Sequence, residues 1–211
     1  MKHIYPTFEN GKILTREMLT ALRDMSRLKE EIAYQDYPKG ILCGCELSVE
    51  GKQICIRPGK IKCKGVVFLL RQEERVEYAP TESYVSLKFR VLEPKISSGA
   101  IYYQTEFALD KRLELDEDEV ELCRFKLKEG ARLRTEYKDF YDIQTEYDTI
   151  NLASATWAAA EGNSLSKVVT DYFARQVLSC ERAEQEDIRF AYLLLQNKEA
   201  VRAEILAEVL L

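Results

Sequence analysis

The sequence contains a single histidine, His3, close to its N-terminus. Ser-His-Asp and Cys-His catalytic arrangements need an imidazole held beside its partner, and a three-histidine zinc site is impossible with one histidine. The sequence also lacks the G-x-x-x-x-G-K-[ST] pattern of ATPases, and no G-x-G-x-x-G stretch opens a helix after a strand. We therefore expect a non-catalytic protein without a nucleotide or any other cofactor.

Long apolar runs are missing as well. Residues 1–6 do not contain the apolar core of a signal peptide, and no stretch has the length of a membrane-spanning helix. We therefore expect a cytoplasmic protein, in which cysteines are reduced thiols. The six cysteines are Cys43, Cys45, Cys55, Cys63, Cys123 and Cys180. Cys43 and Cys45 would lie on one strand face about 7 Å apart, which suits one tetrahedral zinc ion poorly, so we expect buried packing residues and no metal.

The charge balance is acidic, with a formal net charge of −5. A protein that binds nucleic acid or anionic lipid normally presents a basic face, so these partners are not favoured. The best local exception is the stretch 57–64, with Arg57, Lys60, Lys62 and Lys64. Spacing of two along a strand predicts one solvated sheet face, while a nucleic-acid-associated β-barrel protein stays open as an alternative function.

Glycine and proline are scarce, at 9 and 5 of 211 residues, which indicates a globular chain. The first clear element follows Thr15, a plausible N-cap. Apolar residues then recur at helical spacing and predict an amphipathic helix over about 15–34, preceded by an extended arm. These residues are Met18, Leu19, Leu22, Met25, Leu28 and Ile32.

From Gly40 the apolar period changes to two, which predicts strands up to about residue 127. Several short strands separated by turn residues favour an antiparallel β-sandwich or partly closed barrel, within an α+β fold. The acidic stretch Asp110–Glu121 lacks the spacing of a calcium loop and is interpreted as a solvated surface loop.

Helical patterns dominate from Ile150, with Ser164 as the predicted N-cap of a helix over 165–178 and further helices near 188–195 and 198–210. They predict a small C-terminal helical domain. The expected organisation is therefore an N-terminal arm and helix (1–39), a β domain (40–135), a tyrosine-rich linker (136–148) and an α-helical domain (149–211).

The first seventy residues carry a family resemblance. An arm and helix start, a Gly-Ile-x-x-Gly hairpin, a Pro-Gly turn and a Gly-led apolar strand follow one another, marked by Gly11, Gly40, Gly44, Pro58, Gly59 and Gly65. This order resembles the N-terminal part of baseplate and tail proteins of bacteriophages, prophages and contractile injection systems, including the shoulder domain of tail receptor-binding proteins. The resemblance implies a structural or adaptor subunit that forms homo-oligomers, typically trimers, and contacts other tail or baseplate subunits. The helical C-terminus replaces the fibre repeats or receptor-binding head of such proteins, so receptor recognition is not implied.

Two surfaces are predicted to make the protein contacts, because methionine and aromatic side chains are enriched in interface cores. They are the helix residues Met18, Leu22 and Met25, and the linker aromatics Tyr137, Phe140, Tyr141 and Tyr147. An equally open alternative is that these side chains dock parts of the same chain together. A hydrolase that uses paired carboxylates such as Glu46 and Glu50 is a further alternative.

Overall fold

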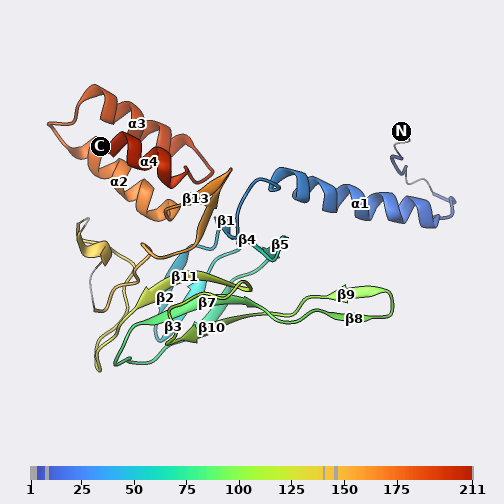
Figure 1. Ribbon diagram of the computed structural model, residues 1–211, viewed down its shortest axis with the longest axis horizontal. Helices are drawn as coiled ribbons and strands as arrows, with labels where there is room; N and C mark the ends of the chain where they lie inside the picture. The colour runs from blue at the N-terminus through green and yellow to red at the C-terminus, as the bar shows by residue number, and fades with distance from the viewer. Residues whose placement is uncertain (1–3, 8–9, 140, 145–146, 211) are drawn as a thin grey trace. The chain divides into compact units, whose positions relative to one another are not determined.

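The computed structural model describes residues 4–7, 10–139, 141–144 and 147–210. The chain divides into two compact units, Met1–Asp36 and Tyr37–Leu211. The first holds the N-terminal arm and helix α1, and the second holds the strands together with the C-terminal helices (Figure 1). The α+β class, the N-terminal helix and the C-terminal helices are confirmed. The strands and the C-terminal helices fall within the second unit.

Helix α1 covers Arg16–Ala33. It begins where expected, because the Thr15 side chain accepts a hydrogen bond from the Met18 backbone N–H at 3.2 Å and so caps one of the free donors of the first turn. It ends at Tyr34, whose N–H donates to the Glu30 carbonyl. No residue of α1 is buried.

The largest sheet of the second unit has five strands in the order β13-β12-β1-β4-β5. They are β1 (Gly40–Gly44), β4 (Gly59–Cys63), β5 (Val66–Leu70), β12 (Trp157–Ala159) and β13 (Gly162–Ser164). The β1 and β12 strands run parallel, with Ile41 opposite Trp157, and the other neighbours are antiparallel.

Two three-stranded antiparallel sheets and one hairpin complete the β structure of the described residues. One sheet has the order β10-β7-β11, formed by Thr105–Asp110, Val85–Val91 and Glu119–Phe125. The other has the order β2-β3-β6, formed by Leu47–Glu50, Gln53–Ile56 and Glu74–Glu77. The hairpin pairs β8 (Lys95–Ser97) with β9 (Ala100–Tyr102). The described residues thus form separate small sheets around a shared apolar core, and they contain no closed barrel.

A bend in the first hairpin explains why one sheet does not continue into the next. Gly44 and Cys45 both have positive φ, at 66° and 55°, so the chain turns out of β1 before β2 begins. The Cys45 N–H donates to the Pro58 carbonyl at 3.3 Å, which brings the return strand close. A β-carbon at Gly59 would lie 2.5 Å from the Cys43 carbonyl oxygen, so only glycine fits there. Two of the glycines that carry the family resemblance therefore form this bend.

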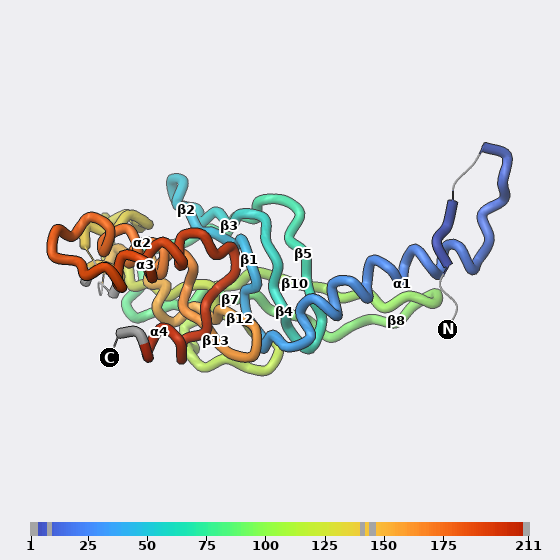
Figure 2. The backbone as a smooth tube through the Cα atoms, turned by 90° about the horizontal axis from the view of Figure 1, so that it is seen from above, coloured from blue at the N-terminus to red at the C-terminus, as the bar shows by residue number. Residues whose placement is uncertain are grey.

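The C-terminal helices are α2 (Lys167–Ser179), α3 (Gln185–Gln196) and α4 (Ala203–Leu210). The α2 and α3 helices lie side by side in both views of the backbone (Figure 2). Ala174, Ala191, Leu194 and Leu206 form their small apolar cluster.

The segment before α2 differs from the sequence prediction. Residues 149–164 were assigned to the α-helical domain, but they supply β12 and β13 to the five-stranded sheet. Ser164 lies at the end of β13, where its hydroxyl donates to the Val201 carbonyl, and Ser166 occupies the N-cap position of α2. Strand pairing is favoured over a helix here because it buries Trp157 and Ala158 beside β1. This contact joins residues more than one hundred positions apart in the sequence.

Candidate functional site

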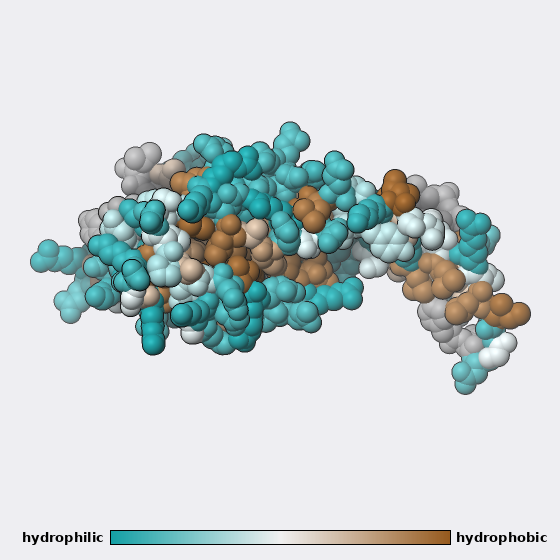
Figure 3. Space-filling view, turned by 90° about the horizontal axis from the view of Figure 1, so that it is seen from below, coloured by the Kyte–Doolittle hydropathy of each residue, from teal (hydrophilic) through white to brown (hydrophobic). Residues whose placement is uncertain are grey.

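One face of α1 is an exposed apolar surface of the first unit. We call Met18, Leu22, Met25, Leu28 and Ile32 the α1 stripe; they follow one another at spacings of three or four residues. Met18 is half-buried, and the other four are between 40% (Leu22) and 65% (Ile32) exposed. Full burial of such a side chain is worth about 1.5–3 kcal/mol, so a partner that covered the stripe would gain several kcal/mol. Apolar side chains of the N-terminal unit reach the surface at the right-hand end of Figure 3.

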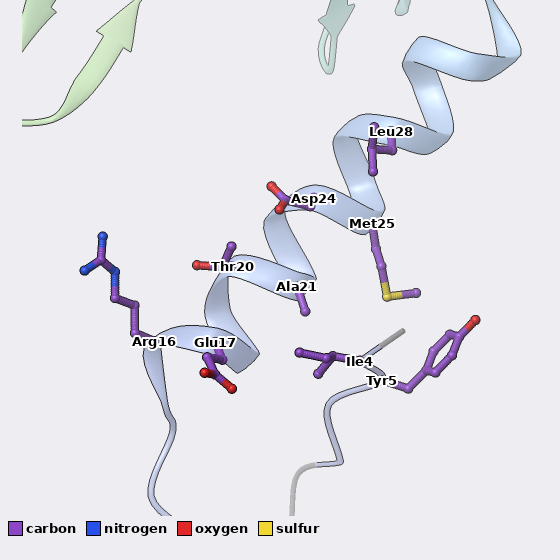
Figure 4. Close-up of a pocket in the computed structure, with 9 residues that line it drawn as sticks. All are labelled: Ile4, Tyr5, Arg16, Glu17, Thr20, Ala21, Asp24, Met25 and Leu28. Carbon is purple, nitrogen blue, oxygen red and sulfur yellow. The ribbon is translucent and has the colours of Figure 1, made fainter. Parts of the chain in front are cut away.

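The N-terminal arm lies along this helix and leaves a hollow of about 570 Å³. Ile4 and Tyr5 of the arm line it opposite Ala21, Met25 and Leu28 of α1 (Figure 4). The Met25 side chain points toward Tyr5, and Ile4 lies near Ala21. Polar and charged side chains also line it, namely Arg16, Glu17, Thr20 and Asp24. The small Ala21 side chain leaves space between the arm and the helix. The hollow can therefore accept an apolar side chain from outside.

The predicted aromatic surface is less uniform. The Tyr137 hydroxyl donates to the Ile150 carbonyl at 2.7 Å, and its ring lies 6.1 Å from the Tyr172 ring of α2. Burial raises the pKa of Tyr137. Tyr147 is half-buried beneath the ammonium groups of Lys126 and Lys128, at 4.6 and 4.1 Å from its ring centre. Both described rings therefore make contacts within the chain.

The remaining two aromatics fall largely outside the described structure. Phe140 lies outside the described residues, and Tyr141 is described only as the first backbone position of a 3₁₀ turn, Tyr141–Gln144. This region was expected to be a linker. Its described part belongs to the second unit, and hydrogen bonds from Arg134 to Asp142 and from the Asp148 N–H to the Lys126 carbonyl at 3.0 Å tie it to residues that precede it.

Sequence reasoning missed a buried layer of charge on the β10-β7-β11 sheet. Lys88 is fully buried, and its ammonium donates to Glu119 at 2.8 Å and to the Glu114 carbonyl at 2.7 Å. Arg90 donates to the other Glu119 oxygen at 2.7 Å and also pairs with Asp110. These side chains occupy the face of the sheet opposite the apolar residues Leu87 and Phe89, since neighbours along a strand alternate.

The acidic stretch Asp110–Glu121 covers that layer. It was interpreted as a solvated loop, but its two ends are strands and Glu119 is only 3% exposed. Burial alone would raise the pKa of Glu119, but hydrogen bonds from Lys88 and Arg90 outweigh it and lower the pKa to about 2. A carboxylate held this firmly in its charged form is suited to a structural ion pair and unsuited to proton transfer. The alternation of Ser86, Lys88 and Arg90 was visible in the sequence, yet it resembles a solvent-facing strand.

The residues on which the nucleic-acid-binding and hydrolase alternatives depend also make ion pairs or hydrogen bonds within the chain. Arg57 lies 3.5 Å from Glu46, Lys64 lies 3.5 Å from Asp118, and Lys62 donates to the Tyr37 carbonyl at 2.7 Å. Glu50 pairs with Arg75 at 2.9 Å. The basic stretch is therefore partly neutralised by its neighbours, and each carboxylate of the hydrolase alternative contacts an arginine.

Four of the six cysteines are buried, as packing residues would be: Cys45, Cys55, Cys63 and Cys123. Burial raises the pKa of Cys45 to about 12, which keeps it a thiol at neutral pH. Within the described residues, no three His, Cys, Asp or Glu side chains are grouped as a metal ion would need.

A second hollow, of about 310 Å³, lies between β1 and the C-terminal helices. Trp157, Lys167 and Asp171 are among the residues that line it. Lys167 donates to Asp171 and to the Leu194 carbonyl, so its charge is already used within the protein.

Comparisons with protein-family models, with curated proteins and with solved structures gave no match. Across the described residues, no helix combines the length and apolar character needed to cross a membrane. The geometry of the α1 stripe is therefore the main guide to function.

Proposed function

We propose that this protein is a non-catalytic structural or adaptor subunit of a phage-like tail or baseplate, assembled in the cytoplasm through protein contacts. The observation that carries the proposal is α1, an 18-residue helix with no buried residue and an exposed apolar stripe. Most helical stability in proteins comes from packing an apolar face rather than from propensity, so an isolated helix with this face uncovered lacks its main source of stability. A helix that keeps such a face uncovered is suited to binding another protein surface.

The tail or baseplate class is supported by the order of motifs in the first seventy residues. Gly44 and Gly59, which carry part of that resemblance, are required by the bend of the first hairpin, so they mark a specific backbone shape. The same resemblance favours a homo-oligomer, with a trimer as the typical state. No comparable observation supports the nucleic-acid-binding alternative or the hydrolase alternative.

Particle association tests the class. The chain, tagged and expressed from its own locus, should sediment in a density gradient with particles that contain tail-tube or baseplate proteins. Flanking genes for those proteins would agree with this outcome. A chain found only at the top of the gradient, while particles form normally, would contradict the proposed function.

The substitution Leu22→Asp tests the role of the helix. It places a carboxylate on the α1 stripe, where burial of an unpaired charge is strongly unfavourable. We expect the variant to lose particle association and self-association while the second unit keeps its melting temperature. Leu193→Asp is the matched control, because Leu193 is an exposed leucine on α3. If Leu22→Asp lowers the melting temperature and leaves assembly intact, the stripe packs within the chain and the role given to α1 is wrong.

A further inference from the structure

The spacing of the apolar residues in α1 indicates how a second helix would pack against the exposed apolar face. Counting Met18 as position a of a heptad, positions a are Met18, Met25 and Ile32, and positions d within the helix are Ala21 and Leu28. The steps of three and four residues average 3.5, which is the repeat of a left-handed coiled coil. The same register extended backward places Leu14 at position d, just before the Thr15 cap.

The charges beside this seam distinguish the possible orientations of two such helices. Positions g are Glu17, Asp24 and Glu31, and the exposed position e residue after Asp24 is Lys29. In a parallel pair, position g of one helix faces position e of the next heptad in the other helix, which sets Asp24 opposite Lys29. In an antiparallel pair, positions g face one another, and three acidic residues would be brought together.

We infer that α1 binds α1 of a second copy of this chain as a parallel coiled coil, with Asp24 of each helix facing Lys29 of its neighbour. The inference rests on the proposed function and names the partner of its docking helix. The heptad register and the Asp24–Lys29 complementarity both come from one sequence, so the surface is complementary to itself. Symmetric self-association is the usual outcome for such a surface.

The hollow between the arm and α1 fits this arrangement. Alanine is small for a core position, and at Ala21 the missing volume faces Ile4 and Tyr5 across the hollow. A leucine or methionine from the second helix would enter this space and contact the arm as well as the helix. The arm would then add apolar contacts that an isolated helix of about 27 Å lacks.

Charge reversal in the full chain tests the orientation. Asp24→Lys and Lys29→Asp should each weaken self-association about tenfold, because attraction is replaced by repulsion at every pair. The double variant should recover association to within about threefold, since the pair is restored with its charges exchanged. Asp24 also pairs with Arg23 of its own chain at 2.7 Å, so some loss of helix stability could accompany Asp24→Lys, and circular dichroism at high concentration controls for it. Ser26→Lys adds a positive charge at position b, away from the seam, and should change association less than twofold.

Sedimentation equilibrium over a concentration series gives the masses and dissociation constants. Recovery in the double variant supports the parallel self-contact, because an unrelated partner protein would still carry its original charges. A double variant weaker than both single variants would overturn the parallel register. An unmodified chain that stays monomeric throughout would overturn self-association, and if it still sediments with particles, the proposed function stands without this inference. A chain that self-associates through α1 but never sediments with particles would support this inference and contradict the proposed function.

Discussion

Replacing Glu119 with glutamine should test the buried charge layer directly. The side chain keeps its shape but loses the negative charge that accepts hydrogen bonds from Lys88 and Arg90, at 2.8 and 2.7 Å. The glutamine amide offers one uncharged acceptor oxygen in place of two carboxylate oxygens. Beyond residue 119, the fully buried Lys88 keeps the Glu114 carbonyl at 2.7 Å and the Asp110 carboxylate at 3.7 Å. The variant therefore leaves a buried ammonium with one distant counter-charge.

Two arguments give the expected size of the effect. Removing one member of a buried ion pair usually costs about 3–5 kcal/mol, and the remaining Asp110 contact favours the lower end of that range. The pKa of Glu119 is lowered from 4.5 to about 2. This shift corresponds to a contribution of about 3 kcal/mol to the free energy of unfolding at neutral pH. We therefore expect Glu119→Gln to lower the free energy of unfolding by about 3 kcal/mol at pH 7.

The sign of the pH dependence follows from the lowered pKa. Because the folded-state value lies below the unfolded one, the carboxylate stabilises the fold fully above the unfolded pKa of 4.5, and this contribution is lost as the pH falls through the folded pKa of about 2. Urea denaturation of both proteins should thus show a difference of about 3 kcal/mol at neutral pH that shrinks to about 1 kcal/mol near pH 2.5.

The control is Glu117→Gln, which removes an exposed carboxylate from the same segment and should change stability by less than about 0.5 kcal/mol at either pH. If Glu119→Gln behaves like this control at neutral pH, Glu119 does not hold the buried ion pair. A difference that stays constant as the pH falls would also refute the reasoning, because the lost stability would then come from packing alone.

Two further predictions concern the first hairpin and the thiols. Gly59→Ala should lower the free energy of unfolding by more than about 2 kcal/mol, because its β-carbon would lie 2.5 Å from the Cys43 carbonyl oxygen. The control Gly51→Ala, where the space is open, should lower it by only about 1 kcal/mol. Equal urea midpoints for the two variants would contradict the close approach at Gly59. In a thiol titration of the native protein, the exposed Cys180 should react first and the half-buried Cys43 next. The four buried thiols should react only after denaturation, when all six are titrated. Fast reaction of Cys45 in the native protein would contradict its burial and its pKa of about 12.

Elements specified by neighbouring residues were the ones that sequence reasoning predicted well. Helix α1 follows from the Thr15 cap and an uninterrupted helical period, and its predicted bounds of about 15–34 differ from the observed Arg16–Ala33 by one residue at each end. The strands β12 and β13 have three residues each, too few for a period to be recognised. They exist because Trp157 pairs with Ile41, and no local pattern encodes a contact of that sequence separation.

The charge layer was missed for a related reason. Polar alternation along Val85–Val91 is the pattern of a strand with one face in solvent. What buries that face is the acidic connection between β10 and β11, whose own composition suggested a solvated loop. Two charged segments cover each other here, because Glu119 and Asp110 neutralise Lys88 and Arg90. Hydropathy examined one segment at a time cannot reveal such a pairing.

The α1 stripe differs from the β12–β13 strands and from the buried charge layer. Its helical period could be recognised in the sequence, but the surface that covers it could not. The α1 stripe predicts an apolar contact whichever surface covers it, and the N-terminal unit leaves the stripe exposed. An 18-residue helix gains little stability from propensity alone, so the packing that stabilises α1 must come largely from whatever covers the stripe. Anything that binds only the folded helix stabilises it by mass action. Folding of the N-terminal unit and assembly of the protein are therefore expected to be linked through the same few side chains.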